Sequence, residues 1–495
     1  MVSWFKERFN YLFRSTKGLM LVDIALISLV TAIWGMLSGP MAEKGFKDFV
    51  VRTLGMQLVE AQREGRIIML YHAIGVAVVA ILVYLITHSV PMRERHRVGI
   101  NATITVGYLT VLFSGLAFAY FGHKWVFHGL FVAGLAVVFY AGCWLTVALW
   151  PWDQEFLVAD MDYAHLSSGV DLERLAFFAM ALATLGSAVF GAVAGSYYGH
   201  GFETFLAENI IREPHHTALE LAVVGHLHIM VALIAIATAL IIGRWFDFKG
   251  LLHKLAMPLV ILGTLVMTLG VWGVVTPLRP IAHTIIYVGA TPAMLGALFL
   301  VIFGWGKLIR KRLAEMGVEN PSFLQRLSAL VHDPLRFGAL WQMVFMNFTV
   351  SGVGIFMAIR LDEIFRVWPA REERIALTGH WHILSGIIAT IILFRFADMM
   401  GLSGRFRRWF GWSIILGSDL AFGAVTIFSM KRLFVSEYNQ QPLVDLTITL
   451  ADIGLITVLA VVAVFLLTRL VNLFGADVGG SQGFARGSAK ERLGQ

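Results

Sequence analysis

Five histidines lie near the starts of three long apolar runs and share one spacing. They are His72 in MLYHAIG, His226 and His228 in VVGHLHIM, and His380 and His382 in TGHWHILSG. The intervals 226 − 72 and 380 − 226 are both 154 residues, which indicates three copies of one structural unit. Imidazole is the usual protein ligand of haem iron, and a histidine inside a spanning segment is a functional-site hypothesis by default. The pattern predicts that the histidines of the three units lie at the same depth in the membrane, where they could bind a metal or haem.

The composition predicts an all-α integral membrane protein. Of the 495 residues, 58% are apolar and 14% charged, with a mean hydropathy of +0.75, values typical of a chain whose surface faces lipid. Windows of about 20 apolar residues predict spans at 18–37, 67–86, 100–119, 125–150, 172–194, 217–242, 252–275, 281–303, 337–359, 375–396, 410–428 and 446–470. Twelve spans in three repeats place four spans in each.

One membrane domain is expected over residues 1–474, with repeats at about 17–150, 172–305 and 337–470. The Gly-rich polar tail at 475–495 is expected to be disordered. The inner loop at 307–336 is basic and expected to be partly helical. The first span is full length and lacks a small-residue cleavage site, so no removable signal peptide is expected.

Basic residues in the loops predict the orientation. With a cytoplasmic N-terminus, the inner side collects about 24 of the 39 Lys and Arg residues, including RERHR at 93–97 and KLIRKR at 307–312. Both termini are then cytoplasmic, as in a bacterial or archaeal inner membrane, and all five histidines lie near the outer ends of spans two, six and ten. This topology explains the net charge of +7, so no nucleic-acid partner is inferred. Cys143 is the only cysteine, which excludes an internal disulfide and covalent haem attachment through CxxCH.

The HxH spacing predicts how the histidines pair. Residues i and i+2 of an α-helix point about 200° apart, so the two histidines of HLH or HWH must serve different sites. If the three repeats surround a pseudo-threefold axis, the first-position histidine of one helix meets the second-position histidine of the next. His72 would then face His382, and His380 would face His228, giving two bis-histidine sites. His226 would face Ile74 and remain a lone ligand, with a third haem as an open alternative.

These motifs resemble subunit I of the haem-copper oxidases and nitric oxide reductases. GHWHILSG at 379–386 is similar to the family's span-ten motif, and NFTVSGVGIF at 347–356 to the span-nine segment of the nitric oxide reductase branch. SMKRL at 429–433 resembles the basic pair that holds haem propionates. The resemblance implies twelve spans in three pseudo-threefold four-helix arcs. It further implies a low-spin haem on His72 and His382, a second haem on His380, and propionate contacts from Lys431 and Arg432.

The chain departs from this family at the second metal. The family binds copper or non-haem iron with a span-six histidine and a further histidine pair, or a histidine pair with a glutamate. Span seven here reads VWGVV, with Val274 and Val275 where the pair would lie, and HLHIM after Gly225 lacks the oxidase tyrosine. Copper held by His226 or His228 alone would be under-coordinated. Neither copper nor non-haem iron is therefore expected.

The leading hypothesis is a membrane haem b protein, an oxidoreductase subunit of a respiratory complex, that transfers electrons through two bis-histidine b haems. Its expected partners are a membrane quinol or other membrane and outer-side redox subunits, including a c-type cytochrome. The alternative is a divergent terminal oxidase or nitric oxide reductase, with a five-coordinate haem on His380 and a second metal on His226 or His228 with a carboxylate such as Glu220. A threefold-repeat transporter without a cofactor leaves HLH and HWH unexplained.

Other ionisable residues in or near spans are expected to be structural or interfacial. A lone histidine near a span end is more often interfacial than a ligand, which applies to His88, His123, His128, His253 and His283. His215 and His216, beside Pro214, fit a surface or propionate contact. Charges inside spans cost free energy unless they are paired or wetted; Glu220, Asp452 and Arg395 are therefore read either as parts of a proton path or as structural contacts.

Overall fold

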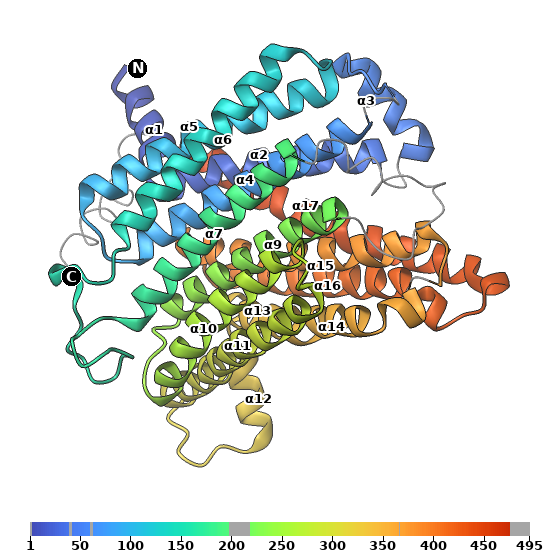
Figure 1. Ribbon diagram of the computed structural model, residues 1–495. Helices are drawn as coiled ribbons and strands as arrows, with labels where there is room; N and C mark the ends of the chain where they lie inside the picture. Colours follow the sequence, from blue (N-terminus) through green and yellow to red (C-terminus); the bar gives the residue numbers. More distant parts are fainter. Residues whose placement is uncertain (1, 39–41, 60–62, 198–217, 366, 476–495) are drawn as a thin grey trace.

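The computed structural model describes residues 2–38, 42–59, 63–197, 218–365 and 367–475, and over these residues it is built from helices without strands (Figure 1). Twelve helical segments of the described chain are long and apolar enough to cross a membrane, which confirms the number of predicted spans. In lipid every backbone N–H and C=O must be satisfied within the segment, and a helix does this.

The spanning elements follow the predicted order. They are α2 (Thr16–Ser38), α4 (Arg63–Ser89), α5 (Glu94–Phe121), α6 (Trp125–Ala148), α7 (Leu172–Tyr197), α9 (Ala218–Trp245), α10 (Leu251–Gly273), α11 (Arg279–Glu315), α13 (Pro334–Val344) continued by a π-helix (Phe345–Val350) and α14 (Ser351–Ile359), α15 (Ala370–Met399), α16 (Gly404–Ser429) and α17 (Gln440–Gly475). The ninth span is thus the only one among them that changes helix type in mid-course.

Three shorter helices lie outside the spans. They are α1 (Val2–Arg14), α3 (Lys47–Leu54) and α12 (Phe323–Val331). The last of these confirms the predicted helix in the basic loop, and in Figure 1 it projects from one end of the bundle. It begins at a capping box, in which the Ser322 side chain accepts from the N–H of Gln325 and the Gln325 side chain accepts from the N–H of Ser322.

Small residues set the closest helix contacts. The three helix pairs with the most extensive packing are α5 with α6, α10 with α11, and α16 with α17. A Cβ added at Gly263 of α10 would lie 2.7 Å from the carbonyl oxygen of Gly289 on α11, and one at Gly454 of α17 would lie 2.5 Å from that of Gly417 on α16. Helix association in lipid depends on such close backbone approach, because lipid is as apolar as the side chains it competes with.

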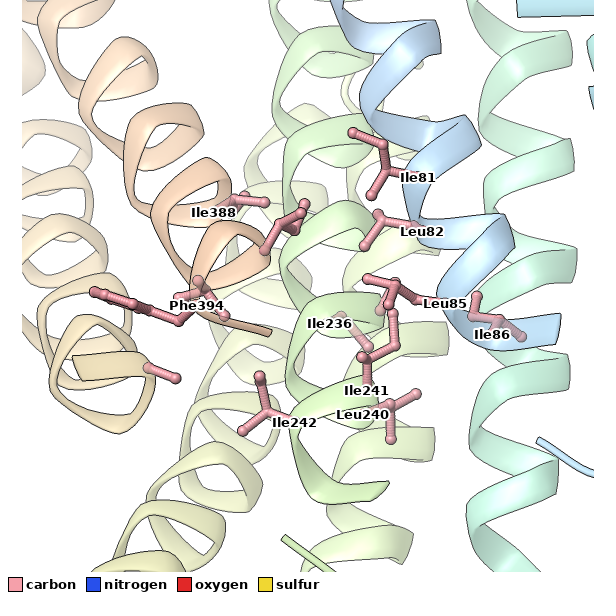
Figure 2. Close-up of a cluster of buried hydrophobic side chains, with 14 of the residues drawn as sticks. Ile81, Leu82, Leu85, Ile86, Ile236, Leu240, Ile241, Ile242, Ile388 and Phe394 are labelled. Atoms are coloured by element: carbon pink, nitrogen blue, oxygen red, sulfur yellow. The ribbon is translucent and has the colours of Figure 1, made fainter. Parts of the chain in front are cut away.

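Spans that lie further along the chain also pack against one another and close the bundle into a ring. The fourth span packs on the fifth (α6 on α7), the eighth on the ninth (α11 on α13), and the last on the first (α17 on α2). The second span of the middle group, α9, packs against both α4 and α15. Figure 2 shows the aliphatic side chains at this junction, with Leu82 and Leu85 from α4, Ile241 from α9 and Ile388 from α15 all buried. Spans two, six and ten therefore meet at the centre of the bundle.

Candidate functional site

The five repeated histidines come together at one end of the junction of α4, α9 and α15. The imidazole of His72 lies beside that of His226, with ring centroids 6.3 Å apart and planes 19° from parallel. Between α4 and α15, the Tyr71 hydroxyl lies 2.9 Å from Nε2 of His382. Between α9 and α15, the indole N–H of Trp381 donates to Nε2 of His228 at 2.9 Å. Each of the three helix pairs is thus joined by a contact that includes a histidine.

Backbone carbonyls fix the orientation of three of these rings. Nδ1 of His72 lies 2.8 Å from the carbonyl oxygen of Ile68, one turn earlier, and His228 and His382 make the same contact with the residue four positions before each, at 2.9 and 2.7 Å. A carbonyl oxygen only accepts, so Nδ1 must carry the hydrogen and Nε2 keeps its lone pair. Metal-ligating histidines are held in this way by their second nitrogen.

His226 and His380 are positioned by glycines on neighbouring helices. Nδ1 of His226 contacts the carbonyl oxygen of Ser187 on α7 at 3.1 Å, and a Cβ added at Gly191 would lie 2.3 Å from the His226 ring. On α14, a Cβ at Gly354 would lie 2.7 Å from the His380 ring. Any larger residue at these two positions would displace an imidazole, so the sequence at α7 and α14 is matched to the histidines opposite.

His380 also borders a cavity between the ninth span, α15 and α16. Its Nδ1 is buried and has no hydrogen-bond partner among the described residues. The cavity is lined by His380 with Val350, Val353, Ala376, Ile383, Thr426, Ser429 and Met430. A buried polar nitrogen without a partner is costly in an apolar setting. If Nε2 of His380 held a metal, Nδ1 would carry the hydrogen.

Tyr71 and His382 form a more open part of the same layer. Both side chains are more than a third exposed, although they lie in helices long enough to span the membrane. The Trp34 ring of α2 meets Tyr71 edge to face, with centroids 5.9 Å apart. Aromatic and imidazole groups of α2, α4 and α15 therefore lie together in an exposed part of the layer.

Two residues that sequence reasoning missed touch the predicted ligands directly. Tyr71 and Trp381 both place a hydrogen-bond donor on a histidine Nε2, the nitrogen that iron would need. The signal was present in the sequence, because Tyr71 precedes His72 and Trp381 lies between the two histidines of HWH. An aromatic donor adjacent to a ligand on a helix points toward a neighbouring helix, but only the packing reveals which histidine it reaches.

The predicted propionate residues lie just after α16. Lys431 opens a short 3-10 helix (Lys431–Leu433); its side chain is buried, its ammonium ion-pairs with Glu372 near the start of α15, and it lies 5.0 Å from the centroid of the Phe428 ring. Arg432 follows in the same turn. Sequence reasoning missed Glu372. A buried lysine that pairs with a carboxylate has the chemistry expected of a propionate contact. Here the carboxylate is that of Glu372.

The remaining candidates divide between the two ends of the bundle. His123 stacks on Phe118, with centroids 4.0 Å apart, and burial followed by the charge of Arg66 lowers the pKa of His123. His253 is fully buried and accepts from the N–H of Ala164 at 3.0 Å. Arg395 pairs with Asp398 at 3.9 Å. His215, His216 and the Glu220 side chain lie outside the described residues.

The donor set fits haem iron. Within the described part of the chain no group of three or more His, Cys, Asp or Glu side chains could hold a metal ion. Haem needs only one or two axial ligands from the protein, since the porphyrin supplies the other four. Imidazoles with a fixed tautomer, one Nδ1 without a partner among the described residues and two glycines packed against imidazole rings are compatible with that requirement.

Comparison of the chain with models of known protein families, with curated proteins and with solved structures finds no match. The functional argument therefore rests on the site itself.

Proposed function

We propose that this protein is a membrane haem b protein that transfers electrons through two bis-histidine haems in a respiratory complex. The observation that carries the proposal is the layer of five histidines on α4, α9 and α15, three of them with Nδ1 held by a backbone carbonyl, so that the lone pair is on Nε2. On His228 and His382 this lone pair accepts a hydrogen bond from Trp381 and Tyr71, which haem iron would replace. Haem iron supplies reversible one-electron chemistry, and the protein tunes it through axial ligands, burial and hydrogen bonds.

The proposed axial pairs are His72 with His382 and His228 with His380. The second pair is supported by the packing of α9 on α15, the two helices that carry His228 and His380. For the first pair, His226 is a competing partner because its ring is the one that lies beside His72. Lys431 and Arg432 would contact propionates, and the buried aliphatic side chains of Figure 2 would keep water from crossing below the haem layer.

Membership of the haem-copper oxidase and nitric oxide reductase superfamily is part of this proposal. It is supported by the tight third-with-fourth span pair in each group of four, and by the contacts α6–α7, α11–α13 and α17–α2 that join the groups in a ring. The proposed electron partners are a quinol or membrane subunit and an outer-side c-type cytochrome, with both termini in the cytoplasm. None of these partners needs a soluble domain on this chain.

One spectrum tests the coordination. If both irons carry two tethered imidazoles, the reduced-minus-oxidised spectrum should show b haem, and carbon monoxide should change it little, since the gas must displace a histidine. His228→Ala should then create a carbon monoxide-binding haem. Elemental analysis should give two haem irons and no stoichiometric copper. Ready carbon monoxide binding by the unaltered protein would overturn the electron-carrier proposal.

A second candidate function is a gas reductase with a five-coordinate haem on His380. The observation favouring it is that Nε2 of His228 is already engaged by the indole of Trp381, while the His380 ring borders a cavity. In this case His228→Ala should leave carbon monoxide binding, already present in the unaltered protein, largely unchanged.

A further inference from the structure

Asp23 is a carboxyl group buried within the first span, away from the histidine layer. Its exposed fraction is 0%, and its α2 neighbours Met20, Leu21 and Ile24 are buried with it. Neither carboxyl oxygen has a hydrogen-bond partner among the described residues. An ionised carboxylate without donors in a low-dielectric interior costs far more free energy than a neutral carboxylic acid. The surroundings of Asp23 therefore favour the protonated form.

Asp419 on α16 provides the contrast within the same molecule. Its Oδ2 accepts from the indole N–H of Trp341 and its Oδ1 from the side-chain amide of Gln342, both at 2.8 Å. Two donors directed at a carboxylate stabilise its negative charge. The chain thus holds one aspartate in a span equipped for a charge and another that is not.

Two tyrosines from different helices lie near Asp23. Tyr84 of α4 and Tyr108 of α5 are both buried in the same hydrophobic cluster as the α2 neighbours of Asp23, and α4 packs directly on α2. Both are neutral groups, and no lysine or arginine forms an ion pair with Asp23 within the described chain. The ionisable groups packed around it from α4 and α5 therefore offer exchangeable protons rather than compensating charge.

Tyr84 begins a line of polar groups that leads along α4 and α5 toward the end where these helices join. Its hydroxyl hydrogen-bonds Oγ1 of Thr105 at 2.6 Å, and Thr105 bonds the carbonyl oxygen of Asn101. The Asn101 side chain in turn accepts from the Thr87 hydroxyl at 2.8 Å. Asn101 lies seven residues after the first residue of α5, which places it about 10 Å from the N-terminal end of that helix. Tyr108 makes no such contact in the described chain.

We propose that Asp23 is a reversible proton-binding site of the membrane domain, protonated at neutral pH and reached from the Arg93 end of α4 and α5 through Tyr84, Thr105 and Asn101. In the release step the carboxyl proton passes to the Tyr84 oxygen, directly after side-chain rotation or through one water, as Tyr84 gives its own proton to Thr105 and Thr105 gives its own proton to a water molecule that enters beside Asn101 and leaves as hydronium. The carboxylate is left behind, and the reverse transfer restores the acid. This proposal is independent of the proposed haem function.

Infrared difference spectroscopy on the full-length protein at neutral pH tests the protonation state. The carboxylic acid C=O band should lose intensity in Asp23→Asn, whereas Asp419→Asn should remove carboxylate bands and leave the C=O band in place. An Asp23→Asn spectrum with the same C=O band as the unaltered protein would overturn the proposal. A second measurement does not depend on the variant folding: a carbodiimide, which reacts with protonated carboxyl groups, should label Asp23 in the unaltered protein, and absence of the label on that peptide would count against it.

The route is tested by hydrogen–deuterium exchange of the same C=O band. Tyr84→Phe removes the hydroxyl that contacts Thr105 and should slow exchange roughly tenfold, equivalent to about 1.4 kcal/mol on the barrier. Tyr108→Phe is the matched control: it removes a neighbouring hydroxyl outside the line and should leave the rate unchanged. Equal rates for the two variants, whether slow or fast, would overturn the route through Tyr84.

Discussion

The two ends of the central helices carry opposite kinds of polar chemistry. At one end, α4, α9 and α15 present imidazoles whose Nδ1–H donates to a backbone carbonyl, and two of these imidazoles also accept from an aromatic side chain. At the other, the same bundle carries ion pairs: Arg244 with Glu173 at 3.0 Å, and Arg407 with both Asp333 and Asp398 at 2.8 and 2.7 Å. Buried aliphatic side chains separate the two layers.

Under the proposed function, the difference separates polar groups that stabilise the fold from polar groups that bind the cofactor. Ion pairs at the charged end offset one another's charge, and removing one partner leaves a partly buried charge. Imidazoles at the histidine end retain lone pairs and an orphaned nitrogen. Substitutions at the histidine end should therefore change cofactor content, and those at the charged end should change stability.

The largest effect is expected from the histidines themselves. His72→Ala and His382→Ala should each abolish binding of the same haem, because each removes one axial ligand of one iron, while the other haem remains. Haem quantification with the spectrum of the residual haem is the measurement. Loss of different haems in the two variants would show that the pairing is wrong, and matched loss in His72→Ala and His226→Ala would assign His226 as the partner.

At the charged end, Arg407→Ala should lower the free energy of unfolding by roughly 3 kcal/mol. This is near the lower limit of the free-energy cost of breaking a buried ion pair, because the carboxylate partners of Arg407 retain partial solvent access. Haem content per folded molecule should not change. Arg408→Ala, at an exposed neighbouring position, is the control and should be nearly neutral. Unfolding in detergent checks this, and a loss of haem without a loss of stability would contradict the division between the two ends.

Gly354→Ala should weaken haem binding at His380, since the added methyl lies 2.7 Å from the imidazole and overpacking costs about 1–3 kcal/mol. Gly352→Ala on the same helix meets nothing within 4 Å and should bind haem normally. Haem titration of both variants measures the effect. Equal haem affinities of the two variants would show that the position of the His380 ring does not depend on a glycine at position 354.

The smallest effect is expected at Asp247, in the loop after α9. Burial opposes its ionisation, but the hydrogen bond from Tyr163 and the charge of Lys307 outweigh burial and hold the pKa of Asp247 below its usual range. The resulting stability is present above the unfolded pKa of about 4 and is lost as pH falls through the lower folded pKa. Because the side chain is partly exposed, Asp247→Asn should cost under about 1 kcal/mol at neutral pH. Thermal unfolding of both proteins across acid pH should show the difference vanish at low pH.

Sequence patterns predicted the spans well because lipid imposes a strong rule on length and apolarity. The twelve segments and the helix in the basic loop were found in this way. The π-helical turn at Phe345–Val350 was not, because a local change of helix type leaves the apolar run intact. Asp23 was also missed: one aspartate inside an apolar run shows neither its burial nor its lack of donors.

The sequence by itself determined a helical membrane protein and the spacing that brings five histidines to similar positions on three helices, because hydropathy and helical period are local properties. Only the tertiary structure decided which side chains meet. It put His72 beside His226, the Tyr71 hydroxyl on His382, the Trp381 indole on His228, and Glu372 on Lys431. These contacts depend on the rotation of each helix about its own axis, which is set by side-chain packing between helices far apart in the chain.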